Sequence, residues 1–202
     1  MSLNNEEFME LVEKVWAFHD RRAPGIAIAC EMVNRALEKL GEVKKLCAVA
    51  ETRTCLPDCI QYITHCTIGN GDLKMMNGIG RYALTLYDRK NNGKGVRIFV
   101  DIRKIEKEKM PETYKFFRRE RSEAVKAGGP ERKASNKIVV EEFLANGRDI
   151  FSMEDVFVTC LEKPPLNNCC VCEECGESFT MEQGESKRCT VCSGEMNYYR
   201  KA

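Results

Sequence analysis

The apolar residues of the N-terminal region follow the period of α-helices. A stripe of apolar side chains recurs every three or four residues near the start of the chain, which predicts a surface helix: Phe8, Leu11, Val12 and Val15. Residues 25–40 are apolar on almost every side, so we expect a buried central helix there. Pro24 suits its first turn, and Gly41 provides its C-terminal stop.

Segments with patterns typical of β-strands follow this second helix. Residues 46–50 form a short apolar run typical of a buried strand, whereas residues 82–87 and 96–100 alternate with a period of two. The Asn-Asn-Gly turn at 91–93 predicts that the last two form a hairpin. Further helices are expected at 58–65, 111–127 and 135–146, and a last strand at 156–160. Because helices and strands do not alternate strictly, the pattern predicts an α+β fold rather than a doubly wound sheet.

Length and charge narrow the classes of protein that fit. A chain of 202 residues accommodates one domain of ordinary size and a small appendage. Its net charge of +1 provides no general attraction to nucleic acid or to a membrane surface. No apolar run approaches the roughly 18 residues that span a bilayer. The first 16 residues are acidic and amphipathic, unlike a signal peptide, so the twelve cysteines indicate a reducing cytoplasm.

The most specific chemistry lies near the C-terminus, where two Cys-x-x-Cys pairs are separated by thirteen residues. Cys172 and Cys175 form the first pair, and Cys189 and Cys192 form the second. Two such pairs bring four thiolates around one tetrahedral ion, and zinc is the ion that this ligand set prefers. The spacing therefore predicts a structural zinc finger of the treble-clef or ribbon type.

The finger is expected to depend on its metal. A domain of fewer than roughly 40 residues rarely folds on apolar burial alone, so ion binding would supply part of its folding free energy. All four positions are thiols, which leaves no open coordination position for catalysis. Neighbouring Cys169 and Cys170 are spare thiols that are able to substitute as ligands. We assign residues 169–202 to the finger and residues 1–163 to a core domain, with a stiff proline-containing linker at 163–168.

Two stretches of the core carry a second pattern. Residues 18–25 are Phe-His-Asp-Arg-Arg-Ala-Pro-Gly, and residues 55–61 are Cys-Leu-Pro-Asp-Cys-Ile-Gln, followed by a glycine loop within residues 64–73. In this order they resemble the formylmethanofuran dehydrogenase E-subunit family, whose motifs are Phe-His-Gly-His-x-Cys-Pro-Gly, Cys-x-x-Asp-Ala-Ile-Gln and Thr-Gly-Cys-Thr-x-Gly-Lys-Gly-Asn-Leu. The likeness covers about residues 5–105, and some members of that family also carry a C-terminal four-cysteine finger.

The resemblance implies a thioredoxin-like core, in which helices flank a mixed sheet, with an active site between the two motifs. It also implies a homodimer, and association with molybdenum or tungsten formylmethanofuran dehydrogenase, an oxidoreductase complex. The sequence departs from the family motifs at several positions. Arg21 replaces a histidine and Ala23 a cysteine, whereas Cys59 and His65 replace an alanine and a glycine. A chemistry that needs the missing cysteine is therefore excluded.

His19 and the cysteines of the second motif are candidate ligands for a second zinc ion. His19 precedes a helix, and Cys55 and Cys59 are one turn apart if the next helix begins near Cys55. Three protein ligands would leave one position for water or substrate. Cys66 matches the family but lies roughly 16 Å from Cys55 along an ideal helix. It joins this site only if the chain folds back at the glycine loop, residues 69–71.

A structural alternative exists for each of these cysteines, because free cysteine is often a small buried core residue. We expect that role for three cysteines inside apolar runs: Cys30, Cys47 and Cys160. Thiol–disulfide exchange is disfavoured, since the core contains no Cys-x-x-Cys pair.

Two functions compete. The first is a metal-binding accessory subunit of formylmethanofuran dehydrogenase, or a homologue of its E-subunit, with a zinc-containing site in its core. An open zinc permits hydrolysis or hydration of a small carbonyl substrate, but the sequence marks no general base beyond the neighbouring Glu51 and Asp58 and leaves enzymatic activity undecided. The second is a nucleic-acid-binding or transcription-linked zinc-finger protein. It is disfavoured because residues 169–202 have a net charge of −2, and because the basic residues of 104–133 alternate with acidic ones.

Overall fold

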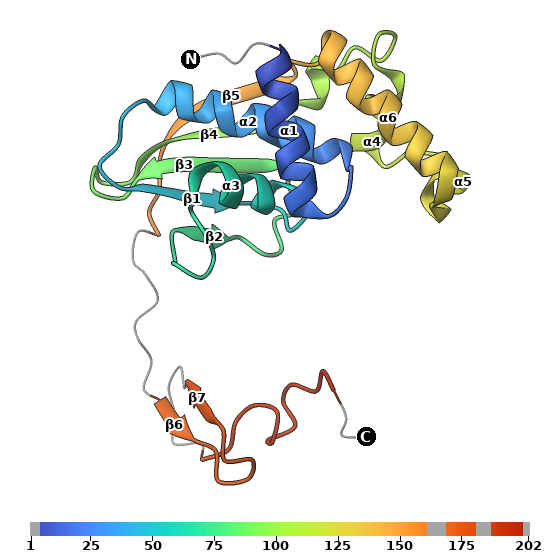
Figure 1. Ribbon diagram of the computed structural model, residues 1–202. Coiled ribbons are helices and arrows are strands. Elements are labelled where there is room, and N and C mark those ends of the chain that lie inside the picture. Colours follow the sequence, from blue (N-terminus) through green and yellow to red (C-terminus); the bar gives the residue numbers. More distant parts are fainter. Residues whose placement is uncertain (1–4, 161–168, 181–186, 200–202) are drawn as a thin grey trace. The chain divides into compact units, whose positions relative to one another are not determined.

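The computed structural model describes residues 5–160, 169–180 and 187–199 (Figure 1). The chain divides into two compact units, Met1–Leu161 and Glu162–Ala202. The segment that the sequence assigns to a proline-containing linker, residues 163–168, lies outside the described residues. None of the described helices combines the length and the apolar composition that crossing a membrane requires.

A five-stranded mixed sheet forms the centre of the first unit, with the strand order β2-β1-β3-β4-β5. The strands are β1 Leu46–Ala50, β2 Leu73–Met75, β3 Ala83–Asp88, β4 Lys94–Val100 and β5 Phe151–Phe157. β1 and β2 pair in parallel, with Ala48 opposite Leu73, and the other neighbours pair antiparallel. The predicted α+β class with a mixed sheet and flanking helices is confirmed.

Three helices cover one face of this sheet (Figure 1). They are α1 Asn5–His19, α2 Pro24–Leu40 and α3 Leu56–Thr64. α2 packs against β3 and β4, and α1 and α3 pack on α2. Because α2 is enclosed by the sheet and by two helices, apolar side chains are needed on nearly all of its sides, as its sequence indicated.

The main core lies between α2 and the sheet. Ile28 and Met32 of α2, Leu86 of β3 and Ile98 of β4 are fully buried. Each such side chain contributes about 1.5–3 kcal/mol through removal of its apolar surface from water. This burial holds α2 on the sheet and thereby fixes the position of its N-terminus. The candidate second metal site of the core domain lies there.

The region between β4 and β5 differs in detail from the pattern-based expectation. It contains a short 3-10 helix, η1, and three helices: η1 Ile102–Lys104, α4 Pro111–Arg118, α5 Glu123–Ala127 and α6 Gly129–Asn146. The helix expected at 111–127 is two helices, because Arg119 takes a left-handed φ of 59° that ends α4. Ser122 then caps α5 by accepting a hydrogen bond from the backbone N–H of Val125.

Two further predictions from the sequence differ from the structure. The first helix continues to His19, although a loop was expected from residue 17, and the last strand of the core is 151–157 rather than 156–160. β2 was not expected at all. It is only three residues long, and its parallel pairing with β1 depends on a contact across the chain that no local pattern encodes.

Candidate metal centres

The ends of two elements bring the motifs of the core together. His19 is the last residue of α1, and Cys55 directly precedes α3 in the loop that leaves β1. Cys55 has a φ of +56°, a backbone conformation that residues other than glycine seldom adopt. Such an outlier persists only where the surrounding structure enforces it, and it is frequent at functional sites.

His19 lies between Cys55 and Asp58. Its Nε2 atom is 3.9 Å from the sulfur of Cys55, and its Nδ1 atom is 2.6 Å from Oδ2 of Asp58. The side chains of His19 and Asp58 retain 19% and 35% of their exposure, so solvent reaches the centre. When Nδ1 carries the proton and donates a hydrogen bond to the carboxylate, the lone pair of Nε2 faces the thiol.

The N-terminus of α2 forms one wall of this centre. A Cβ atom on Gly25 would lie 2.9 Å from the sulfur of Cys55 and 3.0 Å from the hydroxyl oxygen of Tyr82. Tyr82 donates a hydrogen bond of 2.6 Å to the carbonyl of Gly25. Cys55 therefore sits close against the backbone of α2, and glycine is the residue that allows this approach.

Burial keeps the Cys55 thiol protonated in the absence of a ligand. Removal from water raises the pKa of Cys55 to about 11, and the negative charge of Asp58 contributes to this increase. A thiolate at this position therefore requires a cation beside it, or transfer of the proton to another group.

Cys59 lies in the apolar core rather than in the centre. Its sulfur is 3.9 Å from the sulfur of Cys30 and donates to the carbonyl of Ile26 over 3.6 Å. Both cysteines are fully buried, and burial raises the pKa of Cys59 well above its ordinary value. Because α3 begins at Leu56, Cys59 is in its first turn on the side that packs against α2.

Cys66 also lies apart from His19. Its sulfur donates to the carbonyl of Leu46, at the start of β1, and burial raises the pKa of its thiol. The chain turns after α3, where His65 takes a left-handed φ of 57°, but this turn leads Cys66 toward β1. In the part of the chain that the structure describes, no third His, Cys, Asp or Glu joins His19 and Cys55 in a cluster of ligand atoms within 4.8 Å. The structure therefore places Cys59 and Cys66 apart from the pair formed by His19 and Cys55.

The second unit brings its four cysteines into one cluster. β6 Cys169–Val171 and β7 Ser178–Thr180 form a two-stranded antiparallel ribbon, and the first Cys-x-x-Cys pair follows β6. The sulfurs of Cys172, Cys175, Cys189 and Cys192 lie within 4.8 Å of one another. The distance between the sulfurs of Cys175 and Cys189 is 4.0 Å. Ligands of a tetrahedral ion with metal–sulfur bonds of about 2.3 Å are separated by about 3.8 Å, so the group is able to hold a metal ion.

Backbone N–H groups stabilise negative charge in this cluster. The N–H of Cys189 donates to the sulfur of Cys172, and the N–H of Cys192 donates to the sulfur of Cys189. Donation from the backbone of Cys175 and of Cys189 lowers the pKa of Cys172 to about 6. At neutral pH, Cys172 is therefore ready to bind a cation as a thiolate. By contrast, Cys169 lies outside the cluster and is paired with the hydroxyl of Ser178 at 2.9 Å.

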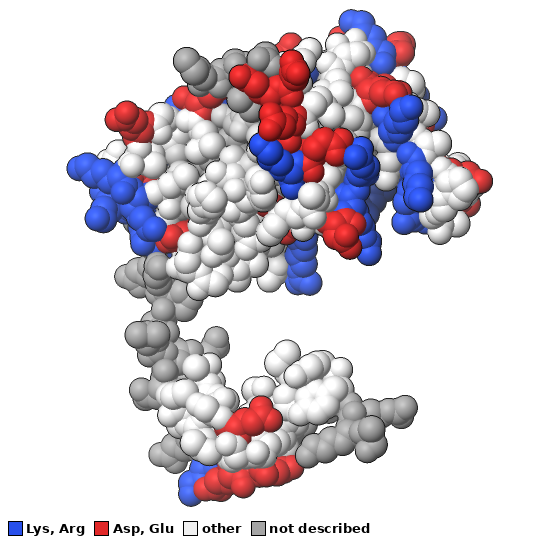
Figure 2. All heavy atoms as spheres, viewed as in Figure 1, with Lys and Arg blue, Asp and Glu red and all other residues white. Residues whose placement is uncertain are grey.

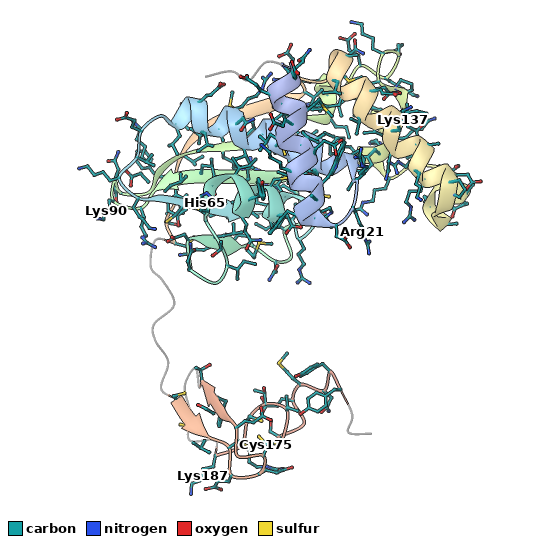
Figure 3. The ribbon with its side chains drawn as sticks, in the orientation of Figure 1. Arg21, His65, Lys90, Lys137, Cys175 and Lys187 are labelled. Atoms are coloured by element: carbon teal, nitrogen blue, oxygen red, sulfur yellow. The ribbon has the colours of Figure 1, made fainter. Side chains whose placement is uncertain are left out.

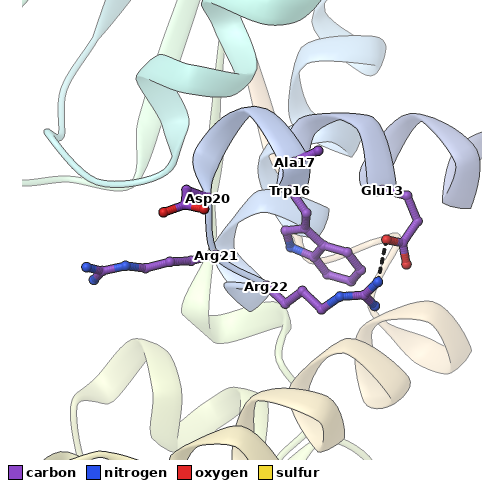
Figure 4. A pocket seen from close by; sticks show the side chains of 6 residues that line it. All are labelled: Glu13, Trp16, Ala17, Asp20, Arg21 and Arg22. Atoms are coloured by element: carbon purple, nitrogen blue, oxygen red, sulfur yellow. Dashed lines mark hydrogen bonds and ion pairs between the residues drawn. The ribbon is translucent and has the colours of Figure 1, made fainter.

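A small hollow of about 250 Å³ opens beside the C-terminal turn of α1 (Figure 4). The guanidinium of Arg22 lies 5.2 Å from the centroid of the Trp16 ring and pairs with Glu13 at 2.7 Å. Arg21 is exposed, and its side chain extends away from Trp16 and Arg22 (Figure 4). This is the position at which the family motif has a histidine. Because a guanidinium has no lone pair for a metal, Arg21 supplies no ligand there.

The sequence missed two residues that shape the core centre. Asp58 was considered only as a nearby carboxylate, although it lies in the first turn of α3, three residues after Cys55. Tyr82 carries no local signal, because its role depends on β3 packing beside the start of α2.

The fold and the sites define a class: a mixed-sheet α+β protein with a His–Cys centre in its core and a separate four-cysteine metal-binding group. Residues 18–158 match the family described as "FmdE, Molybdenum formylmethanofuran dehydrogenase operon". The chain belongs to the FmdE family. The resemblance read from the two motifs of the core is therefore confirmed.

Two relatives extend this finding. A crystal structure of an FmdE-like protein of the tungsten formylmethanofuran dehydrogenase type from Syntrophus aciditrophicus is 33% identical, with a TM-score of 0.74, and the match covers 98% of this chain and 100% of that one. A probable S-adenosyl-L-methionine-binding protein of Archaeoglobus fulgidus is 30% identical over 198 residues. That match covers 90% of this chain but 51% of the relative, so the chain spans about half the length of that protein.

Proposed function

We propose that His19 and Cys55 hold a zinc ion, and that the chain acts as a metal-binding subunit of formylmethanofuran dehydrogenase or as a homologue of its E-subunit. The observation that carries this proposal is the separation of 3.9 Å between Nε2 of His19 and the sulfur of Cys55. Zinc bonds to nitrogen and to sulfur are about 2.0 and 2.3 Å long, so both atoms reach one ion placed between them. The separation is also too long for a strong hydrogen bond, which leaves both atoms available as ligands.

Asp58 supports this assignment as the partner that orients the imidazole. Metal-binding histidines usually donate their second N–H to a carboxylate or carbonyl, which fixes the tautomer and makes the ligand nitrogen more basic. The contact of 2.6 Å between Nδ1 of His19 and Asp58 has this form. A bound cation would also offset the burial that keeps the Cys55 thiol protonated.

The chemistry expected of the core centre differs from that of the finger. With two ligands from the described residues, an ion in the core keeps positions for water, a substrate or a further protein ligand, and zinc with such positions acts as a Lewis acid. This suits hydrolysis or hydration of a small carbonyl or one-carbon substrate. In the finger the four thiolates would surround a zinc ion completely, so its role would be structural.

The partners remain proposals. The molybdenum operon for which the family is described, and the tungsten enzyme named for the Syntrophus aciditrophicus relative, support a setting beside a formylmethanofuran dehydrogenase. A homodimer, a thioredoxin-like classification of the core and a cytoplasmic location are predictions from the sequence and the family resemblance. The S-adenosyl-L-methionine named for the Archaeoglobus fulgidus relative is a candidate ligand here, but half of that protein has no counterpart in this chain.

A second candidate function is metal-free thiol catalysis. It is favoured by the spatial arrangement in which His19 lies between the thiol of Cys55 and the carboxylate of Asp58. In this arrangement an acidic side chain orients the imidazole, and the imidazole takes the proton of the nucleophile. The pKa of about 11 for Cys55 disfavours this function, since an activated cysteine usually has a depressed pKa. The two functions differ in whether the protein retains a metal ion in its core.

Binding of nucleic acid, the alternative considered from sequence, has less support. Basic side chains around α4 and α5 are paired: Arg118 with Glu120, Arg121 with Asn136 and Lys126 with Glu123. Lys and Arg side chains are interspersed with Asp and Glu on the visible face of the core (Figure 2). A mixed surface of this kind lacks the concentrated positive charge that binding to a phosphate backbone needs.

Metal analysis of the full-length protein tests the main proposal. We expect two zinc ions per chain in the wild type, one in Cys55→Ser and in His19→Ala, and two in Cys59→Ser, which serves as the matched control. Substitution with cobalt would add a sulfur-to-metal absorption band that Cys55→Ser reduces. If Cys55→Ser and His19→Ala both keep the full metal content, the core centre holds no metal and thiol catalysis becomes the better candidate.

A further inference from the structure

A second and larger hollow lies along α3, the helix that begins directly after Cys55. It has a volume of about 560 Å³ and is lined by Phe18, Gln61, Tyr62, His65 and Thr67. This volume is within the range of sites that bind small molecules. His65 marks its position at the end of α3 (Figure 3).

The hollow and the centre share two elements. Phe18 lines the hollow and directly precedes His19, the last residue of α1. On α3, Asp58, Tyr62 and His65 are spaced by four and then three residues, which places them on one face of the helix. A molecule lying in the hollow would therefore extend along this face toward Asp58, His19 and Cys55.

Two aromatic rings line the hollow and form an apolar part of its surface. The centroids of the Phe18 and Tyr62 rings are 5.7 Å apart, with an angle of 53° between the ring planes. Phe18 is 54% exposed, although the adjacent face of α1 is buried. An exposed aromatic ring beside a second ring provides a flat apolar surface on which a planar ring is able to stack.

Two polar side chains that line the hollow, Gln61 and Thr67, carry no formal charge and retain hydrogen-bond donors. Gln61 accepts a hydrogen bond from the backbone N–H of Ile68 through Oε1, which leaves its NH₂ group to donate. Thr67 accepts from the backbone N–H of Asn70 through its hydroxyl oxygen, which leaves the hydroxyl proton to donate. Among the described residues, those that line the hollow include no Asp, Glu, Lys or Arg. This combination matches an uncharged planar ring that carries acceptor nitrogens or oxygens at its edge.

We propose that this hollow binds the heteroaromatic ring of a small-molecule ligand, of the purine type, and holds the rest of that ligand beside the His19–Cys55 centre. The assignment deepens the proposed function by naming a class of ligand that would lie beside the centre. It rests on that function only for the role of the centre, because no proposed metal ligand lines the hollow.

Calorimetric titration of the full-length protein with adenosine tests the proposal. We expect saturable binding, no binding of ribose, and a loss of affinity on the order of tenfold in Phe18→Ala, since stacking of one base on an aromatic side chain is worth a factor of this size. Phe18→Tyr should restore binding. Phe157→Ala provides the matched control, because Phe157 is a 67% exposed aromatic residue on β5.

Cys55→Ser separates this proposal from the metal proposal, because it should still bind adenosine after losing the core ion. Three results would overturn the inference. The first is no saturable binding of adenosine at millimolar concentration, and the second is equal affinity in Phe18→Ala and Phe157→Ala. The third is a dimer that Phe18→Ala dissociates and that binds no adenosine in the wild type, because a second copy of the chain would then cover the hollow.

Discussion

The imidazole of His19 lies 3.9 Å from the sulfur of Cys55, although the two residues are 36 positions apart in the chain. The contact forms because α2 packs between the sheet and the other two helices, which brings the end of α1 and the start of α3 to the same place. One carboxylate, Asp58, then holds the imidazole from the opposite side. This three-residue arrangement is the basis of the chemistry that we propose for the core.

Replacement of Asp58 by Asn should weaken the core metal site without removing either ligand. An amide is a poorer partner for the Nδ1–H group, so His19 would be less basic and less firmly oriented. We expect a 10- to 100-fold loss of zinc affinity in Asp58→Asn, the usual effect of removing such a partner. Competition with a zinc-sensitive dye measures it. Glu13→Gln, which alters an exposed carboxylate bound to Arg22, should leave the affinity unchanged.

The reactivity of Cys55 should depend on pH in an unusual range. In protein stripped of metal, alkylation of this thiol by iodoacetamide should reach half of its maximal rate near pH 11, because burial and Asp58 raise its pKa to about 11. An ordinary cysteine reaches half of its maximal rate about two pH units lower. Mass spectrometry of the peptide that contains Cys55 follows the reaction. A plateau near pH 8 would show that the free thiol is already activated, in favour of metal-free catalysis.

The finger should lose its fold with its metal. Cys189→Ser removes one of the four clustered thiols and the sulfur that accepts a hydrogen bond from Cys192. We expect it to abolish tight metal binding by the second unit and to expose that unit to proteolysis, with the first unit unaffected. Cys169→Ser is the control, since Cys169 lies outside the cluster. Equal protease resistance in both variants, with and without chelator, would show that the finger does not depend on a metal.

A buried carboxylate at the end of β1 should make stability depend on pH. Glu51 is 5% exposed and receives hydrogen bonds from Arg97 and Arg81. Burial by itself would raise the pKa of Glu51, but these two arginines together lower it below its ordinary value. Because the folded-state pKa is below the unfolded one, Glu51 stabilises the fold above about pH 4.5, and this contribution disappears as the pH falls.

Glu51→Gln should therefore cost about 3 kcal/mol in the free energy of unfolding at pH 7, because it leaves the guanidinium of Arg97 without its buried partner. Urea denaturation measures the difference, which should shrink toward pH 3. Glu154→Gln alters the other, 52% exposed, partner of Arg97 and should cost less than about 1 kcal/mol. If the two variants unfold alike at pH 7, burial of Glu51 contributes little to the fold.

Local patterns were sufficient for several parts of this protein. The bounds of α2 follow from Pro24, from the long apolar run and from Gly41. The four finger cysteines were identified from spacing alone, because a tight turn of two intervening residues brings each pair to one point wherever it occurs. The FmdE family was recognised from the order of two short motifs, since their residues are placed by the same fold.

The same patterns did not decide which core cysteines meet His19. Cys55 and Cys59 are one helical turn apart, yet Cys59 packs against Cys30 and Ile26, and only Cys55 reaches the imidazole. The difference arises because Cys55 precedes α3 in a left-handed backbone conformation, whereas Cys59 is on its buried side. The turn after α3 places Cys66 beside β1, and the residues of the glycine loop do not specify the direction of that turn.

The sequence by itself determined the helices and strands with strong periods, the family and the four cysteines of the finger, because each of these depends on residues that are close together in the chain. Only the tertiary structure decided the parallel pairing of β2, which side chains lie beside His19, and the hollow that Phe18 and Tyr62 line. These features depend on how segments that are far apart in the chain pack against one another. The packing of α3 buries Cys59, whereas the backbone conformation before α3 places Cys55 beside the imidazole, and a linear pattern specifies neither.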